Sequence, residues 1–375
     1  MQRYDAPTTP SGTLAAPFPW FGGKSGACET VWSAFGEVAN YVEPFAGSAA
    51  ILLGAPLGKR IETINDADGF VANFWRAIAH DPDSVAHHAD WPCNENDLFA
   101  RHSWLVRQAQ TLTERLHSDP DWFDAKIAAW WCWGAANWIG SGWCGGDGPW
   151  IHDGKRIVDS RKLPHLGNAG QGINRKLPHL GNAGQGINRK LPHLGDAGQG
   201  INRKLPHLGD AGRGINRQLP HLGNAGRGDR RKFIFDWFHH LYTRLRDVRV
   251  TCGDWRRVCK DSVTIRHGLT AVFLDPPYTK GAMDYTAKGV GSDLPMQVQQ
   301  WCAKNGHSKL LRIVLCGHKG EHDALLQHGW TMRTWAAHKG YATTEEAVEN
   351  SASETIWCSP YCIPENPLGT LDLFA

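Results

Sequence analysis

The sequence predicts an α/β fold built around a parallel sheet. The apolar residues 269–274 stop at two prolines, which is typical of a buried parallel strand that ends in a rigid turn. A second strand, Tyr41–Glu43, turns through Gly47 into an apolar helix, and the strand 60–64 is followed by the helix 69–79. Strands that alternate with helices in this way form a parallel sheet covered by helices.

The strand 269–274 ends in the tetrapeptide Asp275-Pro276-Pro277-Tyr278. Open α/β sheets bind ligands at the carboxyl edge of their strands, so this turn presents a carboxylate and an aromatic ring at a binding edge. Asp275 and the Pro276 carbonyl can both accept hydrogen bonds from one exocyclic amino group, and Tyr278 can stack on the ring that carries it. The alternative is a strand-ending loop without a chemical role.

The turn after the first strand is a candidate ligand loop. It spans residues 44–48 and leads into the helix 49–53, and a glycine at position 47 lets the backbone approach a bound cofactor closely. Asp66 follows Gly47 by 19 residues, near the spacing of about 20 at which a carboxylate meets a ribose hydroxyl. The alternative role for Asp66 is to cap the helix 69–79.

Further strands are expected in the second half of the chain. Arg249–Cys252 is a short strand that leads into Asp254 and Trp255. The apolar segment 310–316 is a further central strand, and 330–335 and 354–358 are expected to form a closing hairpin.

Three motifs give the chain a resemblance to a known enzyme family. They are FPWFGGK at 18–24, YVEPFAGSAA at 41–50 and DPPY at 275–278. In this order they resemble the glycine-lysine segment, the cofactor loop and the catalytic motif of the Dam-type (class α) DNA adenine-N6 methyltransferases. The resemblance implies a Rossmann-like S-adenosylmethionine-dependent methyltransferase sheet with an inserted target-recognition domain of helices and loops.

The resemblance also implies which residues form the site. The implied catalytic residues are Asp275, Pro276, Pro277 and Tyr278. The implied cofactor-binding residues are Trp20, Gly23, Lys24, Glu43, Phe45, Gly47, Asp66, Asp254 and Asp275. Asp254 is expected to accept a hydrogen bond from the cofactor's adenine while Trp255 packs on the ring, unless the two form a surface turn. Lys24 and Trp20 could instead be a surface lysine and a core tryptophan. Neither a metal ion nor a covalent protein nucleophile is expected.

Five 14-residue repeats of the form RKLPHLGNAGQGIN occupy residues 161–230. Their formal charge is +9, which leaves −6 for the rest of a chain whose total is +3. A segment this basic beside an acidic body is the expected footprint of a polyanion such as DNA, and the alternative is a solvated low-complexity insertion. Because the array departs from the family's usual pattern, the family's GATC specificity is not transferred to this chain.

The segment before the repeats is dense in tryptophan. Six fall within 21 positions, namely Trp130, Trp131, Trp133, Trp138, Trp143 and Trp150. Most are expected in the core, with Trp130, Trp133 and Trp138 on roughly one helical face, while Trp143 is a candidate for contacting DNA bases. We predict a catalytic domain from residues 1–80 and 236–375, and a target-recognition domain over residues 81–235.

Composition narrows the class of protein. A hydrophobic content of 41% is sufficient for a packed core, and no run approaches the roughly 18 apolar residues that would span a bilayer. The first ten residues lack the apolar segment of a secretory signal, so we expect a cytoplasmic protein. The family resemblance implies that it is encoded by a bacterium or a phage. Ten cysteines without paired CxxC spacing indicate reduced thiols, and no cluster has the spacing of zinc ligands.

The expected function is therefore site-specific methylation of adenine N6 in double-stranded DNA, with S-adenosylmethionine as the methyl donor. Two alternatives remain open. One is methylation of cytosine N4, whose enzymes more often carry serine in place of Asp275. The other is a non-catalytic DNA-binding protein that retains the fold.

Overall fold

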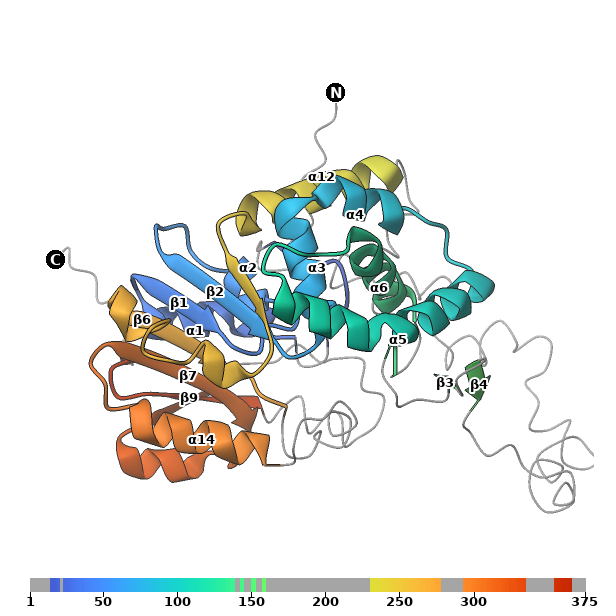
Figure 1. Ribbon diagram of the computed structural model, residues 1–375. Coiled ribbons are helices and arrows are strands. Elements are labelled where there is room, and N and C mark those ends of the chain that lie inside the picture. The colour runs from blue at the N-terminus through green and yellow to red at the C-terminus, as the bar shows by residue number, and fades with distance from the viewer. Residues whose placement is uncertain are drawn as a thin grey trace, which may run out of the picture.

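The structure is a computed structural model that describes residues 14–20, 23–138, 142–144, 150–152, 157–159, 230–277, 293–334 and 354–365. The described chain is mixed α/β, with a seven-stranded, mostly parallel sheet flanked by helices (Figure 1). The strand order is β5-β2-β1-β6-β7-β9-β8. The strands are β1 (Asn40–Glu43), β2 (Ile61–Asp66), β5 (Arg249–Cys252), β6 (Thr270–Leu274), β7 (Leu311–His318), β8 (Thr331–Thr334) and β9 (Glu354–Cys358). The predicted α/β class is confirmed, and the architecture is compatible with a Rossmann-like fold.

The helices surround this sheet. They are α1 (Cys28–Phe35), α2 (Ala50–Leu53), α3 (Gly69–His80), α4 (Pro82–Ala89), α5 (Glu95–Ser118), α6 (Ala125–Asn137), α12 (Arg230–Leu245) and α14 (Leu294–Asn305), with the 3-10 turns η1 (Ser25–Ala27), η7 (Trp255–Arg257), η8 (Ile265–His267) and η9 (Asp323–His328). Helices α3 to α6 each begin at an Asp or Asn whose side chain accepts a backbone N–H of the first turn. In the described part of the chain, none of the helices has the length and apolar composition required to cross a membrane.

The strand order reverses between β1 and β6. Strand β1 pairs in parallel with β2 on one side and with β6 on the other. From this centre the sheet extends through β2 to β5 in one direction and through β6 to β7 in the other. The carboxyl ends of β1 and β6 therefore lie side by side at a topological switch point, the position at which open α/β sheets hold ligands.

Both faces of the sheet are buried along its central strands β1, β6 and β7, as is typical of parallel strands. Along β6, Ala271 and Phe273 belong to one hydrophobic cluster, whereas Val272 and Leu274 belong to another on the opposite face. The second cluster includes Val298 of α14. Every residue of β6 is buried, which confirms the prediction of a buried parallel strand at this position.

A layer of helices continues the first cluster away from the sheet. Helix α3 contacts α6 and α12, and α4 packs between α6 and α12 (Figure 1). The aromatic ring of Phe18 contacts the rings of Phe74, Trp75 and Trp131, with centroid distances from 4.8 to 5.8 Å. The helices within 81–137 therefore share one core with the helices beside the sheet. The proposed division into two domains stays a prediction.

The predicted strands agree with the structure to within two residues at each end. Strand β9 pairs antiparallel with both β7 and β8, which confirms the closing hairpin. Strand β7 extends beyond the predicted end at residue 316 because Gly317 and His318 pair with Thr355 and Glu354 of β9. Two further strands, β3 (Trp150–His152) and β4 (Ile157–Asp159), pair with each other in a separate two-stranded sheet.

The predicted burial of the tryptophans in and just after α6 is only partly confirmed. Trp131 and Trp133 are buried, with 3% and 0% of their surface exposed, whereas Trp130 packs at the edge of the core. Trp138 does not continue the predicted helical face, because α6 ends at Asn137 and the backbone of Trp138 is extended. Trp131 takes the buried position next to Phe18 instead.

Trp143 folds back onto α6. Its indole nitrogen donates to the carbonyl of Trp131 at 2.9 Å, and its ring lies where a Cβ on Gly134 would be, only 1.8 Å away. Only a glycine at position 134 allows this contact. The packing role for Trp143 is therefore favoured over contact with DNA bases.

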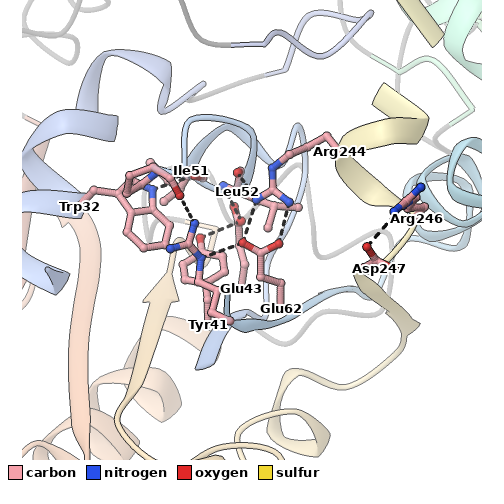
Figure 2. Close-up of polar contacts among 11 residues, drawn as sticks. Trp32, Tyr41, Glu43, Ile51, Leu52, Glu62, Arg244, Arg246 and Asp247 are labelled. Atoms are coloured by element: carbon pink, nitrogen blue, oxygen red, sulfur yellow. Dashed lines mark hydrogen bonds and ion pairs between the residues drawn. The ribbon is translucent and has the colours of Figure 1, made fainter. Parts of the chain in front are cut away.

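An arginine on α12 connects the helical layer to the sheet (Figure 2). The guanidinium of Arg244 donates to both carboxylate oxygens of Glu62 on β2, at 2.6 and 2.8 Å, and to the carbonyl of Leu52 at 2.8 Å. Glu62 also accepts from Arg60 at 2.9 Å. The side chain of Glu62 is 10% exposed, so this bidentate pair lies largely out of water.

Replacing Arg244 by methionine should lower the free energy of unfolding by about 2–3 kcal/mol, because a mostly buried carboxylate loses its bidentate partner. The matched control is Arg246→Met, just beyond the end of the same helix. Arg246 pairs with Asp247 at 3.4 Å, but the two side chains are 60% and 89% exposed, so its loss should cost less than about 0.5 kcal/mol. Urea unfolding measures both changes, and equal stabilities of the two variants would contradict the assigned role of Arg244.

Candidate active site

The loops that follow β1 and β6 form the candidate site. Residues 44–49 follow β1, and Asp275, Pro276 and Pro277 follow β6. Pro276 is buried, while Asp275 and Pro277 are partly exposed. The sequence-predicted site residues that the structure describes lie in these loops, at the ends of β1, β2 and β5, and in the segment before η1. Phe21, Gly22, Tyr278 and residues 161–229 of the repeats lie outside the described residues.

The structure brings Lys24 and Asp275 together. Lys24 Nζ lies 3.1 Å from Asp275 Oδ2, and the two side chains are 4% and 20% exposed. The alternative in which Lys24 is a surface lysine is therefore wrong. The first and last of the three sequence motifs meet in this ion pair, although 251 residues separate them.

Gly47 occupies a conformation that favours glycine. Its φ is +47°, and a Cβ at this position would lie 2.2 Å from the indole nitrogen of Trp20. On its other side, the carbonyl of Gly47 accepts the indole N–H of Trp75 at 2.9 Å. In this structure the close approach predicted for a cofactor at Gly47 is made by Trp20.

Trp20 is partly buried and packs against the core, which agrees in part with the alternative in which it is a core tryptophan. It also lines a cavity of about 30 Å³ together with Gly23, Ser25 and Ser48. A volume of this size holds about one water molecule. A larger ligand could enter here only if the Trp20 segment moved.

Asp66 binds the turn after β1 and does not cap α3. Its Oδ2 accepts the backbone N–H of Gly47 at 2.9 Å, and its Oδ1 accepts the N–H of Asp68 at 2.8 Å. Asp68 caps α3 by accepting the N–H of Phe70 at 2.9 Å. The helix-cap alternative for Asp66 is therefore wrong, and the 19-residue spacing does correspond to a direct contact with the glycine turn.

The ends of β1 and β5 contribute aromatic rings. Trp255 is 6% exposed and lies between Phe45 and Trp301, at centroid distances of 6.0 and 6.1 Å. Burial in this cluster leaves the partly exposed Phe45, rather than Trp255, to present a ring at the sheet edge. The packing of Trp255 on a bound adenine stays a prediction, and the burial of Trp255 leaves little of its ring accessible for such a contact.

Asp254 is bonded within its own turn. It caps η7 through the N–H of Arg256 at 2.8 Å and also forms an ion pair with the Arg256 guanidinium. These hydrogen bonds hold the pKa of the Asp254 carboxyl below its usual value. This arrangement matches the surface-turn alternative, and a role in adenine recognition would require Arg256 to move.

Glu43 is the last residue of β1, and its side chain is buried rather than exposed at the edge of the sheet. It is 2% exposed and accepts hydrogen bonds from the hydroxyl of Tyr41 at 2.9 Å and the N–H of Leu52 at 3.3 Å (Figure 2). Burial raises the pKa of Glu43 from 4.5 to about 8, against the opposing effect of these hydrogen bonds, and the nearby charge of Asp275 adds to the rise. Glu43 therefore holds a proton at neutral pH.

Sequence reasoning missed several supporting residues. Trp75, Asp68 and Tyr41 fix the turn of Gly47, the start of α3 and the carboxyl group of Glu43. Tyr41 and Asp68 had detectable signals, since residues two apart on a strand lie on the same face and an Asp directly before a helix is a preferred cap. Within the described residues, no group of three or more His, Cys, Asp and Glu side chains could hold a metal ion.

No protein-family model matches the chain, and a search of curated proteins finds none significantly similar to it.

Glu43→Gln should change how stability depends on pH. Unfolded Glu43 ionises near pH 4.5 and folded Glu43 near pH 8, so the folded state holds a proton that the unfolded state has released. The free energy of unfolding should therefore fall as pH rises between these values, by up to about 1.4 kcal/mol per pH unit. Glutamine keeps a carbonyl acceptor for Tyr41 and Leu52 but cannot ionise.

Urea unfolding at pH 5, 6, 7 and 8 tests this, with the wild-type protein as reference. The stability difference between Glu43→Gln and wild type should shift in favour of the variant as pH rises. A difference that stays constant with pH would mean that Glu43 is not buried as an uncharged carboxyl group.

Proposed function

We propose that this chain is an S-adenosylmethionine-dependent DNA adenine-N6 methyltransferase. The observation that carries the proposal is the position of Asp275-Pro276-Pro277, directly after the central strand β6 and beside the glycine turn of β1 at the topological switch point. The buried ion pair of Asp275 with Lys24 supports it, because it joins the two outer motifs of the family resemblance in one site.

The proposed architecture is a Rossmann-like methyltransferase sheet with an inserted target-recognition domain. The parallel strands with a terminal antiparallel hairpin support the first part. The second part rests on the chain order, because residues 81–235 enter between β2 and β5. The basic repeats within this insertion favour double-stranded DNA as the partner.

The proposed chemistry centres on one amino group. The N6 lone pair of adenine is delocalised into the ring, so acceptors at its protons are needed to localise it and to aim it. Asp275 and the Pro276 carbonyl are the proposed acceptors, while Tyr278 is the proposed stacking platform for the base held out of the helix. Because Lys24 binds Oδ2, a hydrogen bond from N6 to Oδ1 of Asp275 would leave the ion pair intact. Oδ1 would also receive the departing N6 proton.

The residues at the ends of β1 and β2 have side chains that suit the binding of S-adenosylmethionine. Asp66 at the end of β2 can accept from ribose hydroxyls, and the partly exposed ring of Phe45 can cover a flat base. Gly47, which a larger residue could not replace without displacing Trp20, lies between them. When bound, S-adenosylmethionine supplies the methyl group. Trp20, Gly23 and Lys24 would close this pocket on the other side, while Glu43 would support the turn from below.

The two alternatives differ in what the site should do. Methylation of cytosine N4 uses similar acceptors, but Asp275 favours adenine because the cytosine enzymes more often have serine there. A non-catalytic DNA-binding protein has no need for a carboxylate paired with a buried lysine at the strand edge.

Incubating the protein with DNA and labelled S-adenosylmethionine, followed by nucleoside analysis, tests the proposal. Label should appear in N6-methyldeoxyadenosine. Asp275→Ala should reduce transfer by at least about a hundredfold, the scale expected when one well-placed stabilising group is removed. Label in N4-methyldeoxycytidine would favour the first alternative, and DNA binding without transfer would favour the second.

Asp275→Asn is the matched variant, because removing Asp275 also disturbs buried Lys24. Asparagine keeps the shape and one acceptor oxygen but cannot take up a proton. It should keep the wild-type fold at a lower stability, because Lys24 loses its charge partner, and should still transfer slowly. Undiminished transfer by a folded Asp275→Ala protein would refute the assigned active site.

Asp66→Ala should weaken S-adenosylmethionine binding by about tenfold, because it removes a ribose acceptor and releases the N–H of Gly47. DNA binding measured without cofactor should change little. Asp68→Ala is the control, since it removes the cap of α3 and should lower stability by about 1 kcal/mol without changing cofactor affinity. Calorimetric titration separates the two, and equal cofactor affinity in Asp66→Ala and wild type would remove Asp66 from the binding site.

A further inference from the structure

A second candidate binding site lies in the helical layer. It is a cleft of about 580 Å³ between the end of α4, the first half of α5, Trp130 of α6 and Arg231 of α12. Figure 1 shows the beginnings of α5 and α12 on the side of the helical layer away from the sheet. The volume falls in the range of small-molecule and cofactor sites, which is about 300–1,000 Å³. None of the proposed catalytic or cofactor-binding residues lines this cleft.

The wall of the cleft is built from a buried cation and indole rings. The Arg101 side chain is 6% exposed, and its guanidinium carbon lies 5.3, 4.8 and 4.2 Å from the ring centroids of Trp91, Trp130 and Trp133. Lys126 Nζ lies 4.5 Å from the centroid of Trp130. Cation–π contacts of this kind fix the rings and make the wall electropositive.

Trp91 presents a ring to solvent in a fixed position. It is 47% exposed, yet its indole N–H donates to Asp97 and its backbone carbonyl accepts the indole N–H of Trp133 at 2.8 Å. Because hydrogen bonds at the indole N–H and at the backbone carbonyl already hold Trp91, its ring loses little conformational freedom when a ligand stacks on it. Asp97 is already committed to Trp91 and Asn94, and these hydrogen bonds lower the pKa of its carboxyl.

Two exposed arginines stand at the rim. Within the described part of the chain, the side chains of Arg107 and Arg231 form no hydrogen bond or ion pair, although the guanidinium of Arg231 lies 5.5 Å from the Phe235 ring centroid. With Arg101 they outnumber the two carboxylates of the lining, Asp90 and Asp97. Arg231 also follows directly on the last basic repeat, which ends at residue 230.

We propose that this cleft binds one nucleotide of a DNA strand, with the base stacked on Trp91 and the phosphate held by Arg107 and Arg231. An aromatic platform beside cations is the combination that binds unstacked bases and their backbone. The choice of DNA as the source of the nucleotide rests on the proposed function and on the adjacent basic array. Stacking uses the face common to all bases, so the site should bind strands with little sequence preference.

The experiment is a titration of the full chain with fluorescein-labelled single-stranded oligonucleotide, with the corresponding duplex, and with dAMP alone. Trp91→Ala should weaken single-strand binding by at least about fivefold, the lower end of the effect of removing one base stack. Trp91→Phe keeps a ring without the hydrogen bond to Asp97 and should recover most of the affinity. Circular dichroism and urea midpoints check that each variant folds.

The double variant Arg107→Gln/Arg231→Gln tests the binding of phosphate. It should make the slope of log affinity against log salt shallower by about 0.7 for each phosphate of the single strand that the variant no longer neutralises. Arg246→Gln removes the same kind of charge beyond the other end of α12 and should leave both slope and affinity unchanged.

The outcomes separate this inference from the proposed function. Unchanged affinity in Trp91→Ala, or an unchanged salt slope in the arginine variant, would overturn the cleft assignment even if the wild-type protein methylates adenine. Loss of strand binding in these variants supports the assignment even if the wild-type protein transfers no methyl group. Equal affinity for dAMP and for the strand, both abolished in Trp91→Ala, would identify a free-nucleotide site and overturn the assignment to DNA.

Discussion

The parallel pairing of β1 with β6 is the contact on which the rest of the site depends. It joins Asn40 to Thr270 in register, and the Asn40 side-chain amide donates to the Thr270 hydroxyl at 3.1 Å and to the Val263 carbonyl at 2.8 Å. A one-residue slip would send every side chain of β6 to the opposite face and remove Asp275 from the turn of β1. The buried amide therefore fixes a register that both hydrophobic clusters require.

The turn after β1 is rigid because three different elements hold Gly47. Asp66 at the end of β2 binds its N–H, Trp75 of α3 binds its carbonyl, and the Trp20 ring covers its α-carbon. A ligand that bound here would find a preformed backbone and would meet the Trp20 ring beside Gly47. The site thus combines the fixed backbone of the Gly47 turn with the ring of Trp20, which packs over that turn.

The electrostatics of the sheet edge follow from burial. The charge of Asp275 contributes to the raised pKa of Glu43, and burial, the larger cause, keeps Glu43 protonated at neutral pH. Asp275 can therefore keep its ion pair with Lys24 without a second negative charge beneath it. In the cleft of the helical layer, Arg101, Arg107 and Arg231 outnumber the carboxylates of Asp90 and Asp97, and Lys126 packs on the ring of Trp130.

The sequence by itself determined the strands, the order of the motifs and the two strand-end turns. Local signals suffice for these, since prolines end β6, a glycine with positive φ is required after β1, and apolar runs mark buried strands. The spacing of Asp66 from Gly47 predicted a contact with a ribose hydroxyl, whereas the hydrogen bond of Asp66 to the Gly47 N–H was not foreseen. Sequence could not choose between Asp66 and Asp68 as the helix cap, because both precede α3 and both can accept an N–H.

Only the tertiary structure decided which side chains meet. The pairing of Lys24 with Asp275, the burial of Glu43 and the position of Trp20 over Gly47 all join segments far apart in the chain. The same holds for Trp255, which turns into the core against Phe45 and Trp301, and for the cleft formed by four helices. Such contacts depend on how strands pair and helices pack, and no local pattern encodes them. The physical reason is that burial and electrostatic environment belong to the assembled fold rather than to any one segment.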